Sequence, residues 1–208
     1  MVPVPARIDR AAVARLADER LDWRFKSIPH ALFGKTVGDA VATRPGLFRD
    51  EFVGPVVALD GAALDHNLAT MAAWCAGRGL ALAPHGKTTM APALFAKQLD
   101  HGAWAITAAN AGQLRVYRAF GVSRVVLANQ FLDPDGLRWL AAELDADPEF
   151  EFTCWVDSVR GVDLMTTALA GARRPVDVLV EVGIPGGRTG VRDLGTAKVV
   201  AEAVVASP

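Results

Sequence analysis

The stretch LALAPHGKTTMAPALFAKQL (80–99) contains one complete β/α unit of the chain. Its first five residues are apolar and predict a short buried strand. A polar turn follows, and Thr88 or Thr89 then begins a predicted helix with Pro92 in its first turn. Lys87 stands alone in the turn between this strand and this helix, and its chemistry is the question that the stretch raises.

The same alternation continues on both sides of this unit. The helical segments carry recognisable start signals, such as Asp133-Pro134 and the capping-box pair Asn110 and Gln113. Because parallel strands need crossover helices, strict alternation implies a parallel sheet with helices outside it. The predicted strands lie at 55–59, 80–84, 103–107, 124–128, 151–156 and 176–184.

This repeated unit predicts an α/β fold, either a (β/α)8 TIM-type barrel or a doubly wound sheet. A complete barrel takes about 250 residues. The 208-residue chain offers five predicted strands from Leu80 onward and stops inside a helical segment. We therefore expect an incomplete barrel at 55–208, the N-terminal part of a longer protein. Residues 1–54 are charged and then loop-rich, and we interpret them as an N-terminal extension.

Composition restricts the partners and the compartment. The formal net charge of −1 gives no general attraction to nucleic acid or to an anionic membrane. No apolar run is long enough to span a bilayer, and no secretory leader pattern opens the chain. Cys75 and Cys154 lie inside apolar patterns, which indicates buried free thiols in a reducing compartment. We expect a cytoplasmic protein that acts on a small molecule.

Lys87 has three possible interpretations. A phosphate-loop lysine requires glycine five positions before the GK pair, whereas Pro29 and Ala81 occupy that position in the two GKT segments. A Schiff-base lysine must be neutral to attack a carbonyl, although its free pKa is about 10.4. Partial burial at a barrel mouth and a following helix N-terminus would both favour the neutral amine. The spacing leaves the Schiff-base and solvated-turn interpretations open.

Four ordered segments carry a family resemblance. LAPHGKT resembles the R-P-H-x-K-T segment of the D-threonine aldolase and D-serine dehydratase group, which are pyridoxal-phosphate (PLP) enzymes with the alanine racemase N-terminal type of barrel. The resemblance covers about residues 53–195, and the bacterial amino acid deaminase type is the nearest variety. The other matching segments are VVALDGAALDHNLATMAAWC, GAWAITAANAGQLRVYRAFGVSRVVLANQF and VLVEVGIPGGRTGV.

The resemblance assigns roles to individual residues. Lys87 would hold PLP as a Schiff base, and Arg188 would contact the phenolic oxygen of the cofactor or the substrate. Each further candidate for the cofactor site can also be explained as a side chain that satisfies nearby backbone. These candidates are His85, Asn129, Gln130 and Thr107.

Two departures from the family pattern leave the reaction open. Ala83 replaces the usual arginine before Pro84, and Gly183 replaces the acidic residue of the family's E-V-D-x-G segment. The resemblance implies a PLP-dependent lyase acting on D-amino acids, by deamination and dehydration of D-serine or D-threonine type substrates or by retro-aldol cleavage. An amino-acid racemase and a non-catalytic PLP-binding homeostasis protein remain alternatives, as do an aldolase that needs only the lysine and a structural fragment.

The resemblance also implies features that this chain does not supply. The aldolase and dehydratase branches use a divalent metal held by a C-terminal β domain, and the four histidines of this chain are not spaced as a ligand set. Such barrels usually bind phosphate at their last strands. We therefore expect these 208 residues by themselves to bind PLP poorly and to be inactive. The resemblance further suggests a homodimer.

Overall fold

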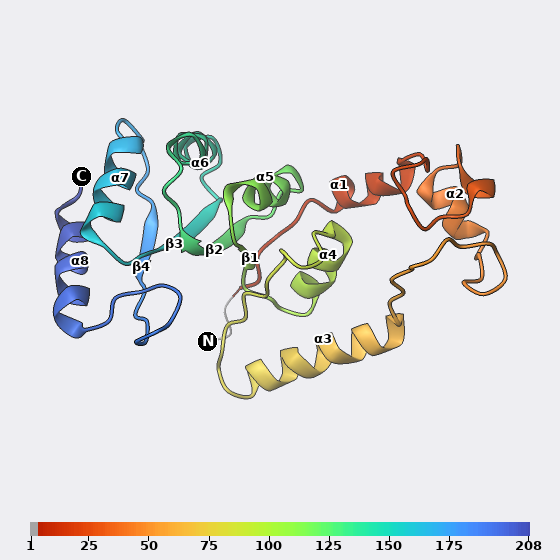
Figure 1. Cartoon of the computed structure of the whole chain (residues 1–208), viewed down its shortest axis with the longest axis horizontal. Helices are drawn as coiled ribbons and strands as arrows, with labels where there is room; N and C mark the ends of the chain where they lie inside the picture. Colours follow the sequence, from red (N-terminus) through yellow and green to blue (C-terminus); the bar gives the residue numbers. More distant parts are fainter. Residues whose placement is uncertain (1–3) are drawn as a thin grey trace.

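The computed structural model describes residues 4–208. Its helical and strand segments follow one another in the order predicted for β/α units from residue 92 onward (Figure 1). The elements are α1 (Arg10–Ala14), η1 (Arg15–Asp18), η2 (His30–Leu32), α2 (Val37–Ala42), α3 (Gly61–Ala76), α4 (Pro92–Asp100), β1 (Ile106–Ala108), α5 (Ala111–Ala119), β2 (Arg124–Gln130), α6 (Pro134–Ala146), β3 (Glu151–Val156), α7 (Val159–Ala168), β4 (Asp177–Val180) and α8 (Leu194–Ala206).

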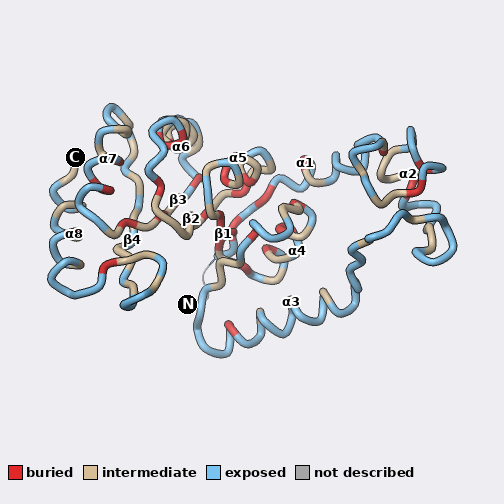
Figure 2. Tube along the Cα trace, in the orientation of Figure 1, coloured by how far each residue is buried: buried red, intermediate tan, exposed pale blue. Residues whose placement is uncertain are grey.

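The four strands form one parallel sheet in the order β1-β2-β3-β4. Helices α5, α6 and α7 lie along one side of it (Figure 1). Side chains on that side are buried, including Val125, Phe152 and Cys154, whereas their neighbours Val126 and Trp155 are only half-buried. This alternation follows from the two-residue period of a strand. The buried residues gather along the sheet and the inner sides of its helices (Figure 2).

The predicted barrel is not closed in this structure, and the sheet has four strands where five were expected. Residues 55–59 form no strand, and Val57 and Leu59 are exposed. Residues 80–84 form no regular strand either, although the Trp104 amide donates to the Leu82 carbonyl at 2.7 Å. Proline lacks an N–H group and cannot donate to a ladder, so Pro84 accounts for the irregular pairing beside β1.

Element boundaries also differ from the sequence-based expectation. The strand expected at 103–107 is limited to β1, and the one expected at 176–184 is limited to β4, because a glycine-rich loop follows it. The helix after Lys87 begins at Pro92 instead of at Thr88 or Thr89. Pro92 remains in the first turn, as predicted, since its missing N–H costs nothing there.

The helix caps predicted at Asn110 and Asp133 are confirmed, and Asp60 and Ser158 cap two more helices. The side chains of Asp60, Asn110, Asp133 and Ser158 each accept a hydrogen bond from the backbone amide three residues later. Each bond satisfies an amide that the helix itself leaves unpaired. The glutamine of the predicted capping box bonds one residue earlier than expected, because its Oε1 accepts from the Ala109 amide at 2.8 Å.

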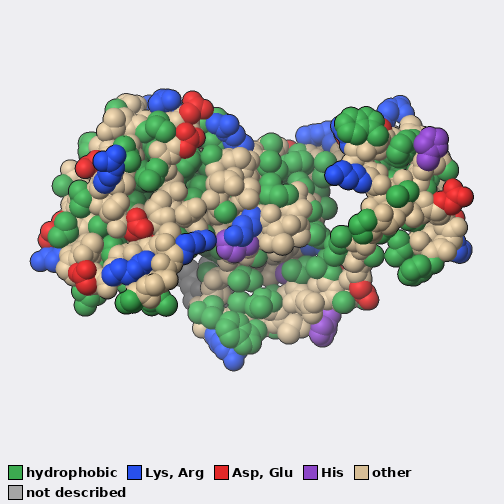
Figure 3. Space-filling view, viewed as in Figure 1, with side chains coloured by type: hydrophobic (Ala, Val, Ile, Leu, Met, Phe, Trp, Pro, Cys, Tyr) green, Lys and Arg blue, Asp and Glu red, His purple; other side chains and the backbone are tan. Residues whose placement is uncertain are grey.

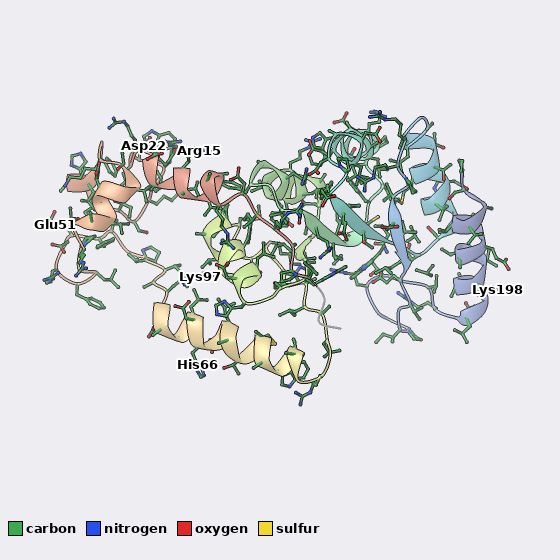
Figure 4. The ribbon with its side chains drawn as sticks, turned by 180° about the vertical axis from the view of Figure 1, so that it is seen from behind. Arg15, Asp22, Glu51, His66, Lys97 and Lys198 are labelled. Atoms are coloured by element: carbon green, nitrogen blue, oxygen red, sulfur yellow. The ribbon has the colours of Figure 1, made fainter. Side chains whose placement is uncertain are left out.

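Helix α3 packs less than its pattern predicts. Of the expected apolar stripe, Cys75 is buried, Leu64 and Leu68 are half-buried, and Met71 is 48% exposed. The helix runs apart from the sheet (Figure 1). An ion pair joins it to α4, and Lys97 extends from α4 toward it (Figure 4).

The first 54 residues do not pack as one piece. Ala6 and Ile8 belong to the main core, and the Asp9 amide donates to the Phe120 carbonyl at 2.8 Å. A separate small cluster contains Leu21, Leu32 and Ala40. Ala6 and Ile8 therefore pack with the α/β unit, while Leu21, Leu32 and Ala40 form a second cluster further along the extension.

Both cysteines are free and buried, as predicted. Burial raises the pKa of the Cys154 thiol to about 12, so it is an inert core residue. Among the helices of residues 4–208, none has the length and apolar character needed to cross a bilayer.

Candidate functional site

The polar candidates lie where the parallel strands end. Gln130 is the last residue of β2, Glu181 directly follows β4, and Arg188 lies in the loop between β4 and α8. His85 and Lys87 follow the extended segment that pairs with β1. Because the strands are parallel, their carboxyl ends share one edge of the sheet, which is where α/β folds place their ligands.

The turn that carries Lys87 is built on a buried glycine. A side-chain carbon at Gly86 would lie 2.6 Å from the Tyr117 hydroxyl and 2.9 Å from both Ile106 and Phe95. The Met90 amide donates to the Gly86 carbonyl at 2.9 Å and closes the turn. Core packing therefore fixes the backbone immediately before Lys87.

Lys87 itself is exposed, which corrects the expectation of partial burial. Because the sheet is open, the turn is left uncovered. Helix α4 begins at Pro92, five residues after Lys87, instead of at Thr88 or Thr89. The lysine ion pairs within residues 4–208 are Lys97 with Asp65 and Lys198 with Glu202, and none involves Lys87. Its amine is thus accessible and free of a carboxylate partner in that part of the chain.

His85 lies close enough to Lys87 and Arg188 for both charges to affect its pKa. Its pKa is lowered from 6.5, first by burial, then by the positive charge of Lys87 and then by that of Arg188. Charges act on a partly solvated ring only over short distances. Lys87 and Arg188 therefore both lie near His85 at this edge of the sheet. Basic side chains gather beside a histidine at the middle of the face in Figure 3.

Thr107 holds the segment that precedes Lys87. Its hydroxyl donates to the Ala83 carbonyl at 2.6 Å, and the side chain is only 4% exposed. Its amide donates to the Pro84 carbonyl at 2.8 Å, and its carbonyl accepts from the Gly86 amide at 3.0 Å. Thr107 thus acts here by positioning the backbone that leads to Lys87.

The two amides at the end of β2 have different partners. Asn129 satisfies local backbone, since its Oδ1 accepts from the Gln130 amide at 3.1 Å and its Nδ2 donates to the Ala109 carbonyl at 3.5 Å. Gln130 instead donates through Nε2 to Oε2 of Glu181 at 2.7 Å. The register between β2 and β3 shifts between Leu127 and Gln130, so the pairing is irregular at the end of β2.

Sequence reasoning missed two carboxylates as parts of this site. Glu181 joins Gln130 to the Arg188 loop, and Asp157 accepts from the Gly190 amide at 3.0 Å. Asp157 stands immediately after the predicted strand at 151–156, and this placement was an available signal. Glu181 was placed inside the predicted strand at 176–184, whereas the observed β4 ends at Val180. Within residues 4–208, no group of three or more metal-binding side chains is found.

The structure contains two sizeable cavities away from this rim. One of about 560 Å³ lies between α7 and α8, and one of about 520 Å³ lies between α3 and α4. Neither is lined by Lys87, His85 or Arg188. The candidate site is therefore the open rim at the strand ends.

Fold and site together define a parallel α/β unit with a lysine turn at the carboxyl edge of its four-stranded sheet. Among solved structures, it is similar to D-threonine aldolase from Filomicrobium marinum, with a TM-score of 0.69 and 29% identity over 76% of this chain and 42% of that chain. It is similar in fold to D-threo-3-hydroxyaspartate dehydratase from Delftia sp. HT23, with a TM-score of 0.63 and 23% identity over 71% of this chain and 38% of that chain.

A sequence comparison agrees with the structural one. The chain is 30% identical over 139 residues to D-threonine aldolase from Arthrobacter sp, which covers 67% of this chain and 36% of the relative. No protein-family model matches the chain. The predicted resemblance is confirmed: in sequence and in fold, the chain resembles part of D-threonine aldolase. It spans roughly two fifths of the length of these relatives.

Proposed function

We propose that the protein containing this chain is a PLP-dependent lyase of D-amino acids and that Lys87 is the residue that binds the cofactor covalently. The observation that carries the proposal is that the turn with Lys87 and the loop with Arg188 both follow segments of one parallel sheet and therefore share its carboxyl edge. The relatives support it by their names, an aldolase and a dehydratase of D-configured amino acids.

The residues at the rim fit this cofactor. PLP needs a primary amine for its aldehyde, positive charge for its anionic groups and an apolar surface for its ring. Lys87 supplies an accessible amine, and Arg188 supplies charge at the same rim. The half-buried side chains of Val126 and Trp155 lie on the sheet face opposite the helices and supply apolar surface.

When bound, PLP supplies the electron sink that makes the bonds at the substrate α-carbon labile. The residues of the chain would bind the cofactor and the substrate and move the proton. The Lys87 amine would hold the cofactor and would serve as a base beside the substrate α-carbon. His85 stays mostly neutral near pH 7, because its pKa is lowered, and so adds little charge next to Lys87. Arg188 binds an anionic oxygen of the cofactor or the substrate.

The substrate that we propose is a small D-amino acid with a hydroxyl on the β-carbon. The relatives are named for D-threonine and D-threo-3-hydroxyaspartate, and both molecules carry that group. Loss of the hydroxyl as water gives a 2-oxo acid and ammonia after hydrolysis. Cleavage between the α- and β-carbons gives glycine from D-threonine, together with an aldehyde.

Two paired measurements on the protein that contains this chain test the proposal. A visible absorbance band on adding PLP should disappear in Lys87→Ala and persist in Lys97→Ala, because Lys97 is committed to an ion pair with Asp65. Incubation with D-threonine and D-serine should then release ammonia or an aldehyde. A band that survives Lys87→Ala would contradict the assignment of Lys87. Mere loss of optical activity would indicate a racemase instead, and a stable band without any turnover would indicate a carrier of the cofactor.

A further inference from the structure

The carboxylate of Glu181 bridges two elements at the candidate site. Its Oε2 accepts from Gln130 Nε2 and its Oε1 accepts from Thr189 Oγ1, each at 2.7 Å. An ionised carboxylate only accepts hydrogen bonds, and here both oxygens are engaged by donors from different segments. Glu181 therefore fastens the loop after β4 to the end of β2.

The loop that Glu181 holds is closed at its base. The Gly183 amide donates to the Val191 carbonyl and the Val191 amide donates to the Glu181 carbonyl, both at 2.8 Å. The backbones cross closely there, because a side-chain carbon at Gly190 would lie 2.5 Å from the Gly183 nitrogen. Arg192 also binds this loop, donating to the carbonyls of Gly187, Thr189 and Gly190.

Arg188 is displayed on this closed loop, next in sequence to the residue that Glu181 binds. The backbone hydrogen bonds at the base fix only the two ends of the loop. The hydrogen bond from the Thr189 hydroxyl to Glu181 holds a residue within the loop, next to Arg188. We propose that Glu181 is the positioning residue that sets the location of Arg188 relative to His85 and Lys87. The inference rests on the proposed function only for the role of Arg188 and not for the fastening of the loop.

Amide hydrogen exchange of the 208-residue chain tests the fastening without any cofactor. Glu181→Ala and Thr189→Val each remove the bond inside the loop, and Thr189→Val keeps the shape of the side chain. We expect exchange across residues 183–191 to become faster by on the order of tenfold, the value of a lost bond to a charged group. Thr189→Ser and Glu181→Gln should restore slow exchange, since both can still bridge the two groups.

A matched control separates this effect from general loss of stability. Glu151 makes two hydrogen bonds with Arg124 near the opposite end of the strands. Glu151→Gln should therefore leave exchange in 183–191 unchanged. Unchanged exchange in both Glu181→Ala and Thr189→Val would overturn the proposal, as would equal acceleration in the control.

A double-mutant cycle tests the action through Arg188. The quantity is the fraction of Lys87 labelled by PLP after borohydride reduction, in Glu181→Ala, Arg188→Gln and the double variant. If Glu181 acts by placing Arg188, its substitution lowers labelling severalfold alone and has no further effect when Arg188 is already replaced. Independent losses that add would overturn the proposal. These labelling experiments use the protein that contains this chain. If the wild-type protein acquires no label at Lys87, the proposed function fails and the exchange measurement alone decides the role of Glu181.

Discussion

At the residue scale, the candidate site depends on the absence of a side chain at Gly86. The glycine lets the backbone approach the Tyr117 hydroxyl and the Phe95 ring, and Lys87 follows directly at the surface. Sequence reasoning singled out Lys87 for its chemistry, but it could not show that its neighbour is a packing requirement. That fact depends on Tyr117, which lies thirty-one positions further along the chain, and no local pattern reports such a contact.

We predict that Gly86→Ala destabilises the chain by about 1–3 kcal/mol, because the added carbon overlaps packed core atoms. Chemical denaturation measures the free energy of unfolding. Gly61→Ala is the matched control, since nothing lies within 4 Å of an added carbon at the start of α3, and it should be neutral or slightly stabilising. Equal effects at the two glycines would contradict the packing that positions Lys87.

A second prediction concerns the titration of His85. Removing either nearby positive charge should raise the pKa of the ring, more in Lys87→Ala than in Arg188→Gln. Because the folded pKa lies below the unfolded one, His85 favours folding above the unfolded pKa, and that contribution is lost as pH falls through the folded pKa. NMR titration of the ring protons measures these values.

The control for this titration is Arg138→Gln on α6, whose charge is not among the causes of the shift. It should leave the His85 titration unchanged. A His85 pKa that does not move in Arg188→Gln would separate Arg188 from the rim that carries Lys87.

At the element scale, the extended segment before Lys87 is held to β1 chiefly through Thr107. Three hydrogen bonds from this one residue replace a regular ladder that Pro84 cannot complete. The apolar pattern of 80–84 indicated a strand, but pairing depends on the partner segment as well as on the segment itself. The caps at Asn110 and Asp133 were predicted correctly because a cap needs only its own next three residues, whereas the start predicted at Thr88 or Thr89 was wrong.

We predict that Thr107→Val costs about 1–3 kcal/mol, since it leaves the Ala83 carbonyl without its donor in a part-buried place. Thr107→Ser keeps the hydroxyl and should recover most of the loss. Thermal unfolding of the three proteins provides the comparison. A Thr107→Val protein as stable as the wild type would show that this bond does not hold the Lys87 segment.

At the scale of the whole molecule, the sequence predicted the parallel α/β class, while closure and burial could not be predicted from it. The alternating apolar segments at 124–128 and 151–156 became β2 and β3, because both faces of their pattern agree with buried strands. Residues 55–59 have the same character and yet stay exposed, since a strand is stable only with a partner beside it. The expected burial of Lys87 was wrong for the same reason, because it assumed a closed barrel around the turn.

Covalent trapping tests the central claim most directly. The protein that contains this chain is incubated with PLP, reduced with borohydride and digested, and mass spectrometry locates the label. The account predicts that Lys87 is labelled well above the other lysines. These include Lys97 on α4 and Lys198 on α8 (Figure 4). Label spread over Lys26, Lys35, Lys97 and Lys198 as heavily as over Lys87 would contradict the claim that the rim beside Arg188 is built to receive the cofactor.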